Sequence, residues 1–179
     1  MTLFEAIPLF DRHLAVLGRT ADTRQTYRSN VRRFAEFLEQ RWGRPPEIEA
    51  VTQKDVTAYL EDMLDRGRVA ATRGSALNAI RAFFRFALDA ELTTADPTAR
   101  IKAPRQPNPL PRYLDASEVQ LFLERCTDPY AKAIAGFLYY TGLRVNELCN
   151  LRRDDVDLRR GVLHVRRGKG QKGRLVPLS

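Results

Sequence analysis

The sequence lacks the features that mark membrane, secreted and metal-binding proteins. It contains no apolar run near the roughly 18 consecutive residues that a membrane-spanning helix needs. Residues 1–20 contain no basic segment leading into an apolar block with a small-residue cleavage site, as a signal peptide would. Only two cysteines, Cys126 and Cys149, are present, too few for a disulfide framework or a zinc site. We therefore expect a cytoplasmic protein with no membrane partner, no metal and no cofactor.

Composition and charge favour a folded protein with an acidic partner. The 179 residues are 44% hydrophobic and 29% charged, close to average globular usage. Lys and Arg total 30 against 22 Asp and Glu, which gives a formal net charge of +8. This excess favours nucleic acid as the partner, with an anionic membrane surface second. A helical interaction module without a DNA role, in which the charge only aids solubility, is a third alternative.

Four amphipathic segments precede residue 93. Apolar residues recur there at intervals of three and four, which is typical of helices with one buried face. The second helix is expected to begin behind Asp22 or Thr23 and to end at Gly43, before two prolines that cannot continue a helix. The spacing predicts a compact four-helix domain over residues 1–92. The apolar face of its first helix consists of Leu3, Ile7, Phe10, Leu14 and Leu17.

The chain beyond residue 92 divides into a linker and a second domain. Residues 93–112 contain five prolines and no hydrophobic period, which indicates an extended linker. Helical spacing resumes after residue 113, and Tyr139 and Tyr140 fall within it as core or hinge positions. Two short β-branched runs around a glycine-rich turn then predict a β-hairpin. Residues 113–179 are therefore expected to form a partial α+β domain in a mainly α-helical chain.

Two motifs near the C-terminus match phosphate-binding signatures only formally. The segment 168–173 spells G-x-G-x-x-G, but it is followed by Arg-Leu-Val-Pro-Leu, in which Pro177 argues against the helix that a dinucleotide site requires. His164 and Arg167 spell H-x-x-R, but alternation along a strand puts these two side chains on opposite faces. A solvated strand face is the interpretation that we favour for the second motif.

The segment T-G-L-R-V-N-E-L, residues 141–148, is more specific. Gly142 is expected to end one helix, and Arg144 to lie in the first turn of the next, beside N–H groups that favour an anion. A guanidinium at that place can bind two phosphate oxygens. Glu147 follows three residues later, on the same helical face, and can orient the guanidinium. Taken by itself, the segment is explained best by a surface ion pair between Arg144 and Glu147.

The order of the motifs resembles the tyrosine recombinases, and among them the Xer and phage-integrase-like bacterial branch. T-G-L-R-x-x-E-L is followed by an acidic D-D-V-D segment and by V-x-V-x-x-G-K-G-x-K-x-R-L-V-P-L. Upstream, Thr23-x-x-x-Tyr27, Thr72-Arg73 and Asp96-Pro97 are similar to the N-terminal domain and linker of that family. The resemblance covers essentially the whole chain. It implies a four-helix, SAM-like core-binding domain, a linker, and the N-terminal part of a catalytic domain that ends in the hairpin.

The resemblance also implies roles for individual residues. Arg144 matches the catalytic arginine of the family, which stabilises charge on the non-bridging phosphate oxygens. Lys169 matches the hairpin lysine that donates a proton to the departing 5′ oxygen, with Lys172 as a rival in the same loop, and Glu147 matches a supporting position. The partners implied are double-stranded DNA and other recombinase protomers, in a homo- or hetero-oligomer. The basic residues expected to contact the DNA are Arg24, Arg28, Arg32, Arg73, Arg81, Arg85, Lys172 and Arg174.

The other catalytic groups of the family do not occur in this sequence. They are a second H-x-x-R box, a further His or Trp and the nucleophilic tyrosine, all C-terminal to the hairpin. A complete recombinase forms a 3′-phosphotyrosyl bond and passes it to a partner strand. Without the nucleophile, we expect this chain to bind DNA and not to cut it. A truncated, non-catalytic DNA-binding regulator or architectural protein is the alternative to a portion of a recombinase.

Overall fold

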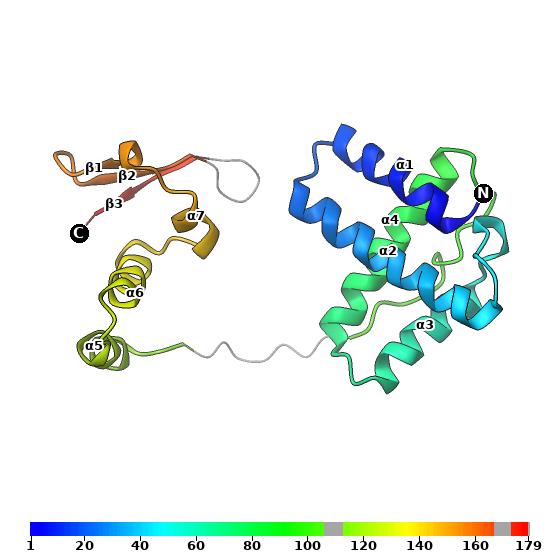
Figure 1. Cartoon of the computed structure of the whole chain (residues 1–179), viewed down its shortest axis with the longest axis horizontal. Coiled ribbons are helices and arrows are strands. Elements are labelled where there is room, and N and C mark those ends of the chain that lie inside the picture. Colours follow the sequence, from blue (N-terminus) through cyan, green and yellow to red (C-terminus); the bar gives the residue numbers. More distant parts are fainter. Residues whose placement is uncertain (106–112, 167–172, 179) are drawn as a thin grey trace. The chain divides into compact units, whose positions relative to one another are not determined.

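The computed structural model describes residues 1–105, 113–166 and 173–178. The chain forms two compact units, Met1–Pro109 and Leu110–Ser179 (Figure 1). Among the described residues, no helix is both long enough and apolar enough to span a membrane. The elements in chain order are α1 (Leu3–Val16), α2 (Ala21–Trp42), η1 (Ile48–Ala50), α3 (Gln53–Asp65), α4 (Ala70–Asp89), α5 (Ala116–Arg125), α6 (Pro129–Thr141), α7 (Val145–Cys149), η2 (Arg153–Asp155), β1 (Val156–Asp157), β2 (Val162–Val165) and β3 (Arg174–Pro177).

Capping side chains set where helices of the first unit begin. Thr52 and Asp55 bond to each other across the start of α3, with Asp55 Oδ2 accepting from the backbone N–H of Thr52 at 2.9 Å. Helix α2 begins earlier than the sequence indicates. Its cap is Thr20, whose hydroxyl accepts from the backbone N–H of Thr23 at 3.3 Å, so Asp22 lies inside the first turn.

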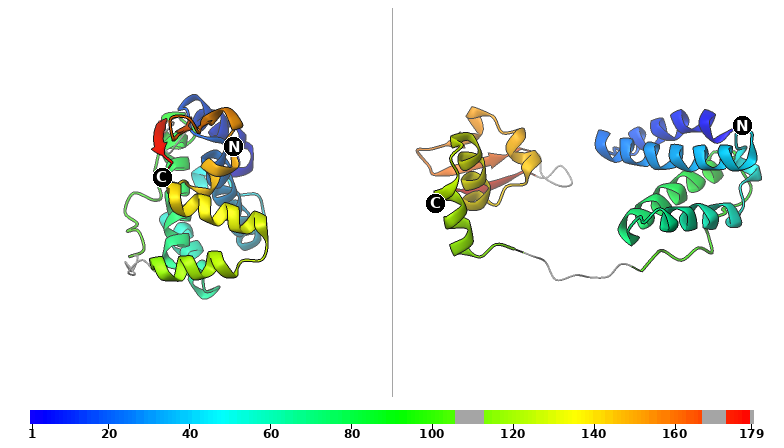
Figure 2. Two further views of the ribbon diagram at one scale, coloured as in Figure 1. Left: turned by 90° about the vertical axis from the view of Figure 1, so that its left-hand side faces the viewer. Right: turned by 60° about the horizontal axis from the view of Figure 1, so that its bottom comes forward.

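The core of the first unit lies where α2 packs against α1 and α4 (Figure 2). Phe10, Phe34 and Phe83 are fully buried there. The rings of Phe10 and Phe83 meet edge to face with centroids 5.5 Å apart, a favourable arrangement for two aromatic quadrupoles. The predicted helical bundle is confirmed. Its first apolar face ends sooner than expected, because α1 stops at Val16 and Leu17 is 57% exposed.

The first part of the segment assigned to the linker packs on this bundle. Thr98 is 1% exposed, and Ile101 contacts the bundle core. Asp96 Oδ1 accepts hydrogen bonds from both the backbone N–H and the hydroxyl of Thr98, each at 2.7 Å. Arg81 of α4 donates to the carbonyl oxygen of Ile101. Residues 96–101 are therefore held against α4 and extend the first unit beyond its last helix.

The second unit contains α5, α6 and α7 and a three-stranded antiparallel sheet of order β1-β2-β3. The predicted hairpin is confirmed, because β2 and β3 pair with Leu163 opposite Val176 and with Val165 opposite Arg174. Leu163, Val165 and Val176 are buried together with Leu143 in a small core. This core lies between the sheet and the turn that leads into α7.

Helices α5 and α6 form where the sequence predicts them but bury little. In the described part of the chain, Leu123 is the one buried residue on these two helices. Tyr139 and Tyr140 are 45% and 55% exposed, so they are not core positions. Phe122, on α5, is 50% exposed. Hydrophobic spacing predicted both helices correctly, but no described element covers their outer apolar side chains.

Phe83→Ala should destabilise the first unit by about 3–5 kcal/mol, because it removes a fully buried ring from the core. Trp42 is the only tryptophan and packs against this core, so its fluorescence during denaturant unfolding reports on the first unit. Leu64→Ala is the control, since Leu64 is 52% exposed, and it should change the stability by less than about 0.5 kcal/mol. Equal losses in the two variants would contradict this account of the core.

Candidate functional site

The T-G-L-R segment forms the turn between α6 and α7. Gly142 ends α6 with a φ of +61°, a left-handed conformation that glycine adopts without steric cost. Leu143 is 6% exposed and anchors the turn in the small core. Arg144 is the N-cap residue of α7, not a first-turn residue as expected from the sequence. Its side chain is 61% exposed, so the turn presents a guanidinium at the surface.

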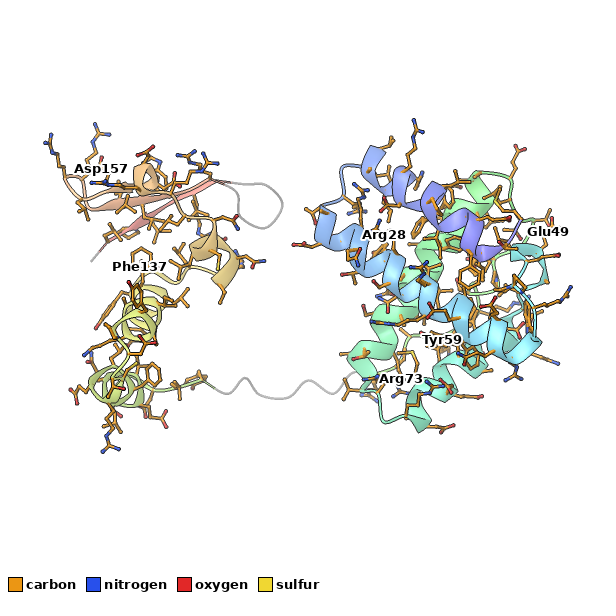
Figure 3. The ribbon with its side chains drawn as sticks, in the orientation of Figure 1. Arg28, Glu49, Tyr59, Arg73, Phe137 and Asp157 are labelled. Atoms are coloured by element: carbon orange, nitrogen blue, oxygen red, sulfur yellow. The ribbon has the colours of Figure 1, made fainter. Side chains whose placement is uncertain are left out.

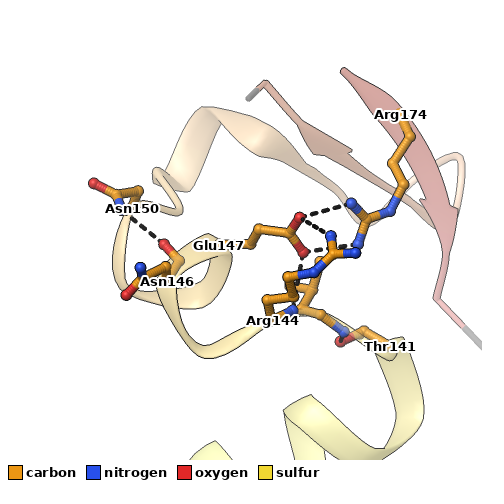
Figure 4. A network of polar contacts seen from close by, with 7 residues as sticks. Thr141, Arg144, Asn146, Glu147, Asn150 and Arg174 are labelled. Atoms are coloured by element: carbon orange, nitrogen blue, oxygen red, sulfur yellow. Dashed lines mark hydrogen bonds and ion pairs between the residues drawn. The ribbon is translucent and has the colours of Figure 1, made fainter. Parts of the chain in front are cut away.

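Glu147 lies at the centre of a cluster of polar contacts (Figure 4). Its side chain is only 5% exposed. Glu147 Oε2 accepts from the backbone N–H of Arg144 and Oε1 accepts from Arg144 Nη1, both at 2.9 Å. Arg174, at the start of β3, donates Nη1 to Oε1 at 2.8 Å and Nη2 to Oε2 at 2.7 Å. One buried carboxylate thus accepts four N–H donors from two arginine residues. We call these three residues the arginine–glutamate cluster.

Two guanidinium groups share one carboxylate, so the arginine–glutamate cluster has a formal charge of +1. The hydrogen bonds from Arg174, followed by the one from the backbone N–H of Arg144, lower the pKa of Glu147 to about 2. The same contact raises the pKa of Arg174. The backbone N–H of Arg144 is bonded to Glu147, so this donor at the start of α7 is used within the protein.

The register of β3 places Arg174 in this cluster. Val176 is 9% exposed and Leu175 is 62% exposed, so residue 174 shares the core-facing side of the strand with Val176. His164 pairs with Leu175 on the opposite face, in agreement with the solvated strand face proposed for it. The sequence analysis counted Arg174 as a DNA contact and missed its pairing with Glu147. The alternation of Leu175 and Val176 is the signal that could have located it.

A second buried carboxylate lies near the first. Asp155 is 3% exposed, accepts from the backbone N–H of Arg152 at 2.9 Å, and forms an ion pair with Arg166 at the end of β2. These contacts, the backbone hydrogen bond first, lower the pKa of Asp155. Glu147, Asp155 and Arg166 line a groove of about 590 Å³. The two carboxylates therefore bind different arginines of the hairpin, Arg166 directly after β2 and Arg174 at the start of β3, at the same end of this strand pair.

Some predicted site residues lie outside the described residues. These are Lys169 and Lys172, the two candidates for the proton donor, and Arg167 of the H-x-x-R motif. Within the described ranges, no three His, Cys, Asp or Glu side chains are grouped so that they could hold a metal ion. Cys126 is half-buried and Cys149 is exposed.

The arginines of α2 that were expected to contact DNA form ion pairs within the first unit (Figure 3 labels Arg28). Arg24 and Arg28 both contact Asp11 of α1, with Nε–Oδ1 distances of 3.0 Å and 3.5 Å. The hydrogen bonds from Arg24 lower the pKa of Asp11. Arg32 is more exposed and lies 3.9 Å from Glu36. Part of the positive charge of this helix is therefore compensated by neighbouring carboxylates.

The three candidate arginines of α4 differ from one another. Arg81 and Arg85 line a groove of about 920 Å³ together with Arg19, and Arg81 also donates to the carbonyl of Ile101. Arg73 is labelled in Figure 3, and its Nε atom is buried without a hydrogen-bond partner among the described residues. An unpaired buried N–H is costly. Because this atom has almost no solvent-accessible surface, it is not placed to reach an acceptor outside the protein.

Two family models match the chain. The model of the phage integrase N-terminal SAM-like domain matches residues 8–94, and the model of the phage integrase family matches residues 112–179. The chain belongs to the tyrosine recombinase, or phage integrase, family. The resemblance inferred from the motifs is thereby confirmed, as is the SAM-like class of the N-terminal helices.

Individual relatives agree with this assignment. Tyrosine recombinase XerD of Pseudomonas aeruginosa is 34% identical over 96% of this chain and 59% of its own length. Tyrosine recombinase XerA of Thermococcus kodakarensis is 36% identical over 97% of this chain and 57% of its own length. The chain thus spans about three-fifths of the length of these relatives. A crystal structure of a lambda integrase tetramer bound to a Holliday junction has the same fold, with a TM-score of 0.80 and 22% identity over 99% of this chain and 51% of that chain.

Glu147→Gln should alter how the stability of the second unit depends on pH. The pKa of Glu147 is about 2 in the folded protein against an ordinary 4.5, so its contacts stabilise the fold fully above about pH 4.5, and this contribution is lost as the pH falls toward 2. The stability difference between wild type and Glu147→Gln should therefore shrink over that range. Methyl resonances of Leu163 and Val176, followed by NMR during urea titrations at several pH values, measure it. A difference that stays constant with pH would contradict the ionised cluster.

Proposed function

We propose that this chain is the DNA-binding portion of a site-specific tyrosine recombinase, and that the complete protein breaks and rejoins DNA through a 3′-phosphotyrosine. The observation that best supports the proposal is the exposed guanidinium of Arg144, held by a buried carboxylate within a cluster of formal charge +1. Attack on a phosphodiester puts additional negative charge on the non-bridging oxygens. A guanidinium fixed in advance stabilises that charge without reorganising during the reaction.

The proposed roles are those that the resemblance to the family implies for each residue. Arg144 binds the scissile phosphate, and Glu147 orients it through Nη1 and the backbone N–H. Lys169 donates a proton to the departing 5′ oxygen, and Lys172 is the alternative donor. A phosphotyrosyl bond conserves the energy of the broken phosphodiester, so rejoining needs no ATP. The six tyrosines of the sequence all precede β2, so we assign DNA binding without cleavage to these 179 residues.

Duplex DNA is the proposed partner of both units. Arg32 and Arg85 are exposed on the first unit, where a phosphate can reach them. The lambda integrase structure is a tetramer on a Holliday junction. By analogy, we propose that the complete protein assembles on DNA with copies of itself or with a related recombinase, in the cytoplasm.

The alternative is a non-catalytic DNA-binding regulator or architectural protein. Both proposals require duplex binding by this chain, and they differ only in whether the complete protein has the nucleophile. The presence of a tyrosine and a second H-x-x-R box in the reading frame that follows the codon for Ser179 would favour the recombinase. Their absence from the gene would favour the regulator.

Duplex binding by the 179-residue chain should weaken steeply with salt, by about 0.9 log units of affinity per log unit of salt for each phosphate contacted. Arg85→Gln should reduce that slope by about one such contact, since Arg85 is exposed and lines the groove of the first unit beside Arg81. Fluorescence anisotropy with a labelled duplex at several salt concentrations measures both. Arg160→Gln removes the same charge from an 83% exposed side chain and is the matched control, expected to keep the wild-type slope. An affinity that does not change with salt would contradict the proposed function.

A further inference from the structure

Arg174 has the charge of a DNA contact but the geometry of an internal ligand. Its Nη1 and Nη2 atoms donate to the two oxygens of Glu147 at 2.8 Å and 2.7 Å, so both terminal nitrogens of the guanidinium are bonded to a carboxylate. A bidentate pair of this kind fixes the relative orientation of both planar groups. Arg174 is also less exposed than Arg144, at 37% against 61%. The Nη1–Nη2 edge of Arg174 is therefore occupied by Glu147, and a phosphate could use only its remaining N–H donors, on the less exposed of the two side chains.

Arg144 is bonded to the same carboxylate in a different way. Only Nη1 of its side chain donates to Glu147, and the second bond comes from its backbone N–H. A guanidinium has five N–H donors, so the other edge of Arg144 can donate to a phosphate while Nη1 stays bonded. The two arginines therefore differ in role. Arg174 binds the carboxylate of Glu147 through both Nη atoms, whereas Arg144 uses one Nη atom and has further N–H donors available for a ligand.

Arg174 also sets the net charge of the arginine–glutamate cluster. A pair of Arg144 and Glu147 alone would be neutral, and its carboxylate would offset part of the attraction between the guanidinium and a phosphate. Arg174 adds a second positive charge from a strand 27 positions along the chain. The cluster then presents a net charge of +1 at the exposed guanidinium. Arg174 also joins the start of β3 to the turn before α7, so the hairpin and the turn are held together at the point where Arg144 emerges.

We propose that Arg174 is a positioning residue for Arg144: it orients the Glu147 carboxylate, compensates its charge, and so leaves the Arg144 guanidinium available to a DNA phosphate. This inference rests on the proposed function, in which Arg144 is the phosphate ligand. In the competing account, Arg174 contacts a DNA phosphate itself, as its charge alone suggests.

The first arm of the test uses the 179-residue chain without DNA. The side-chain carboxyl carbon of Glu147 is followed by NMR between pH 6 and pH 3.5 in wild type, Arg174→Gln and Arg166→Gln. Wild type should show almost no titration in this range, since the pKa of Glu147 is about 2, and Arg174→Gln should show a clear one. The other charged groups near the carboxylate are Arg144 in the cluster and Arg152, Asp155, His164 and Arg166 along the groove, and Arg174→Gln leaves all of them in place.

Arg166→Gln is the matched control for this arm. It removes an arginine that pairs with the other buried carboxylate of the same unit, Asp155, and that does not contact Glu147. It should leave the Glu147 titration close to that of wild type. If Arg174→Gln also leaves the titration unchanged, while retaining the methyl spectrum of the folded hairpin, the positioning role is overturned.

The second arm is a double-mutant cycle of duplex binding with Arg144→Gln, Arg174→Gln and the double variant. Each single change should weaken binding by about tenfold, the usual value of one charged hydrogen bond, and the double variant should bind no more weakly than Arg144→Gln alone. Single losses that multiply in the double variant would identify Arg174 as an independent DNA contact and overturn the proposal.

Arg174→Lys is a second variant, which tests the role of Arg174 if Arg174→Gln does not fold. Lysine keeps the charge and a simple phosphate contact but lacks the fork that orients Glu147. We expect Arg174→Lys to lose affinity for DNA, and unchanged affinity would support direct contact instead. Absence of duplex binding by the wild-type chain would overturn the proposed function, whereas the Glu147 titration decides the role of Arg174 independently of DNA.

Discussion

The rest of the candidate site depends on one buried carboxylate. Glu147 is 5% exposed and accepts hydrogen bonds from Arg144 and Arg174, so it joins the turn before α7 to the first residue of β3. A buried charge is tolerated in a protein only when it is compensated, and here two positive groups compensate one negative group. The surplus charge is carried at an exposed guanidinium. In the proposed function, Glu147 would itself repel a phosphate, yet it holds in place the arginine proposed to bind one.

Local signals were sufficient to predict the first unit. Apolar residues three and four apart depend on neighbours in the sequence, and this spacing predicted the four helices correctly. The start of α2 was predicted too late, because its cap is Thr20. Burial in the second unit was harder to predict, because it depends on what packs against a helix. The same apolar spacing predicted α6 correctly but also suggested core positions for Tyr139 and Tyr140, which are about half exposed.

In the candidate site, too, the contact between sequence neighbours was predictable and the long-range contact was not. Arg144 and Glu147 are three residues apart, so their contact could be inferred from the motif alone. The contact of Glu147 with Arg174 spans 27 positions and depends on the register of β2 and β3, which motif spacing does not specify. The ion pairs of Arg24 and Arg28 with Asp11 likewise join two helices, α2 and α1. They could not be predicted from the spacing of charges along α2 alone. The motifs therefore could not predict contacts between side chains that lie far apart in the sequence.

The central claim is that Arg144 binds a DNA phosphate while Arg174 stays on Glu147. NMR of the arginine side-chain Nε–Hε groups, recorded while a duplex is added, tests it most directly because each arginine gives its own resonance. The account predicts that the Arg144 resonance shifts in a saturable manner while the Arg174 resonance keeps its position. A shift of the Arg174 resonance with that of Arg144 unchanged would contradict it.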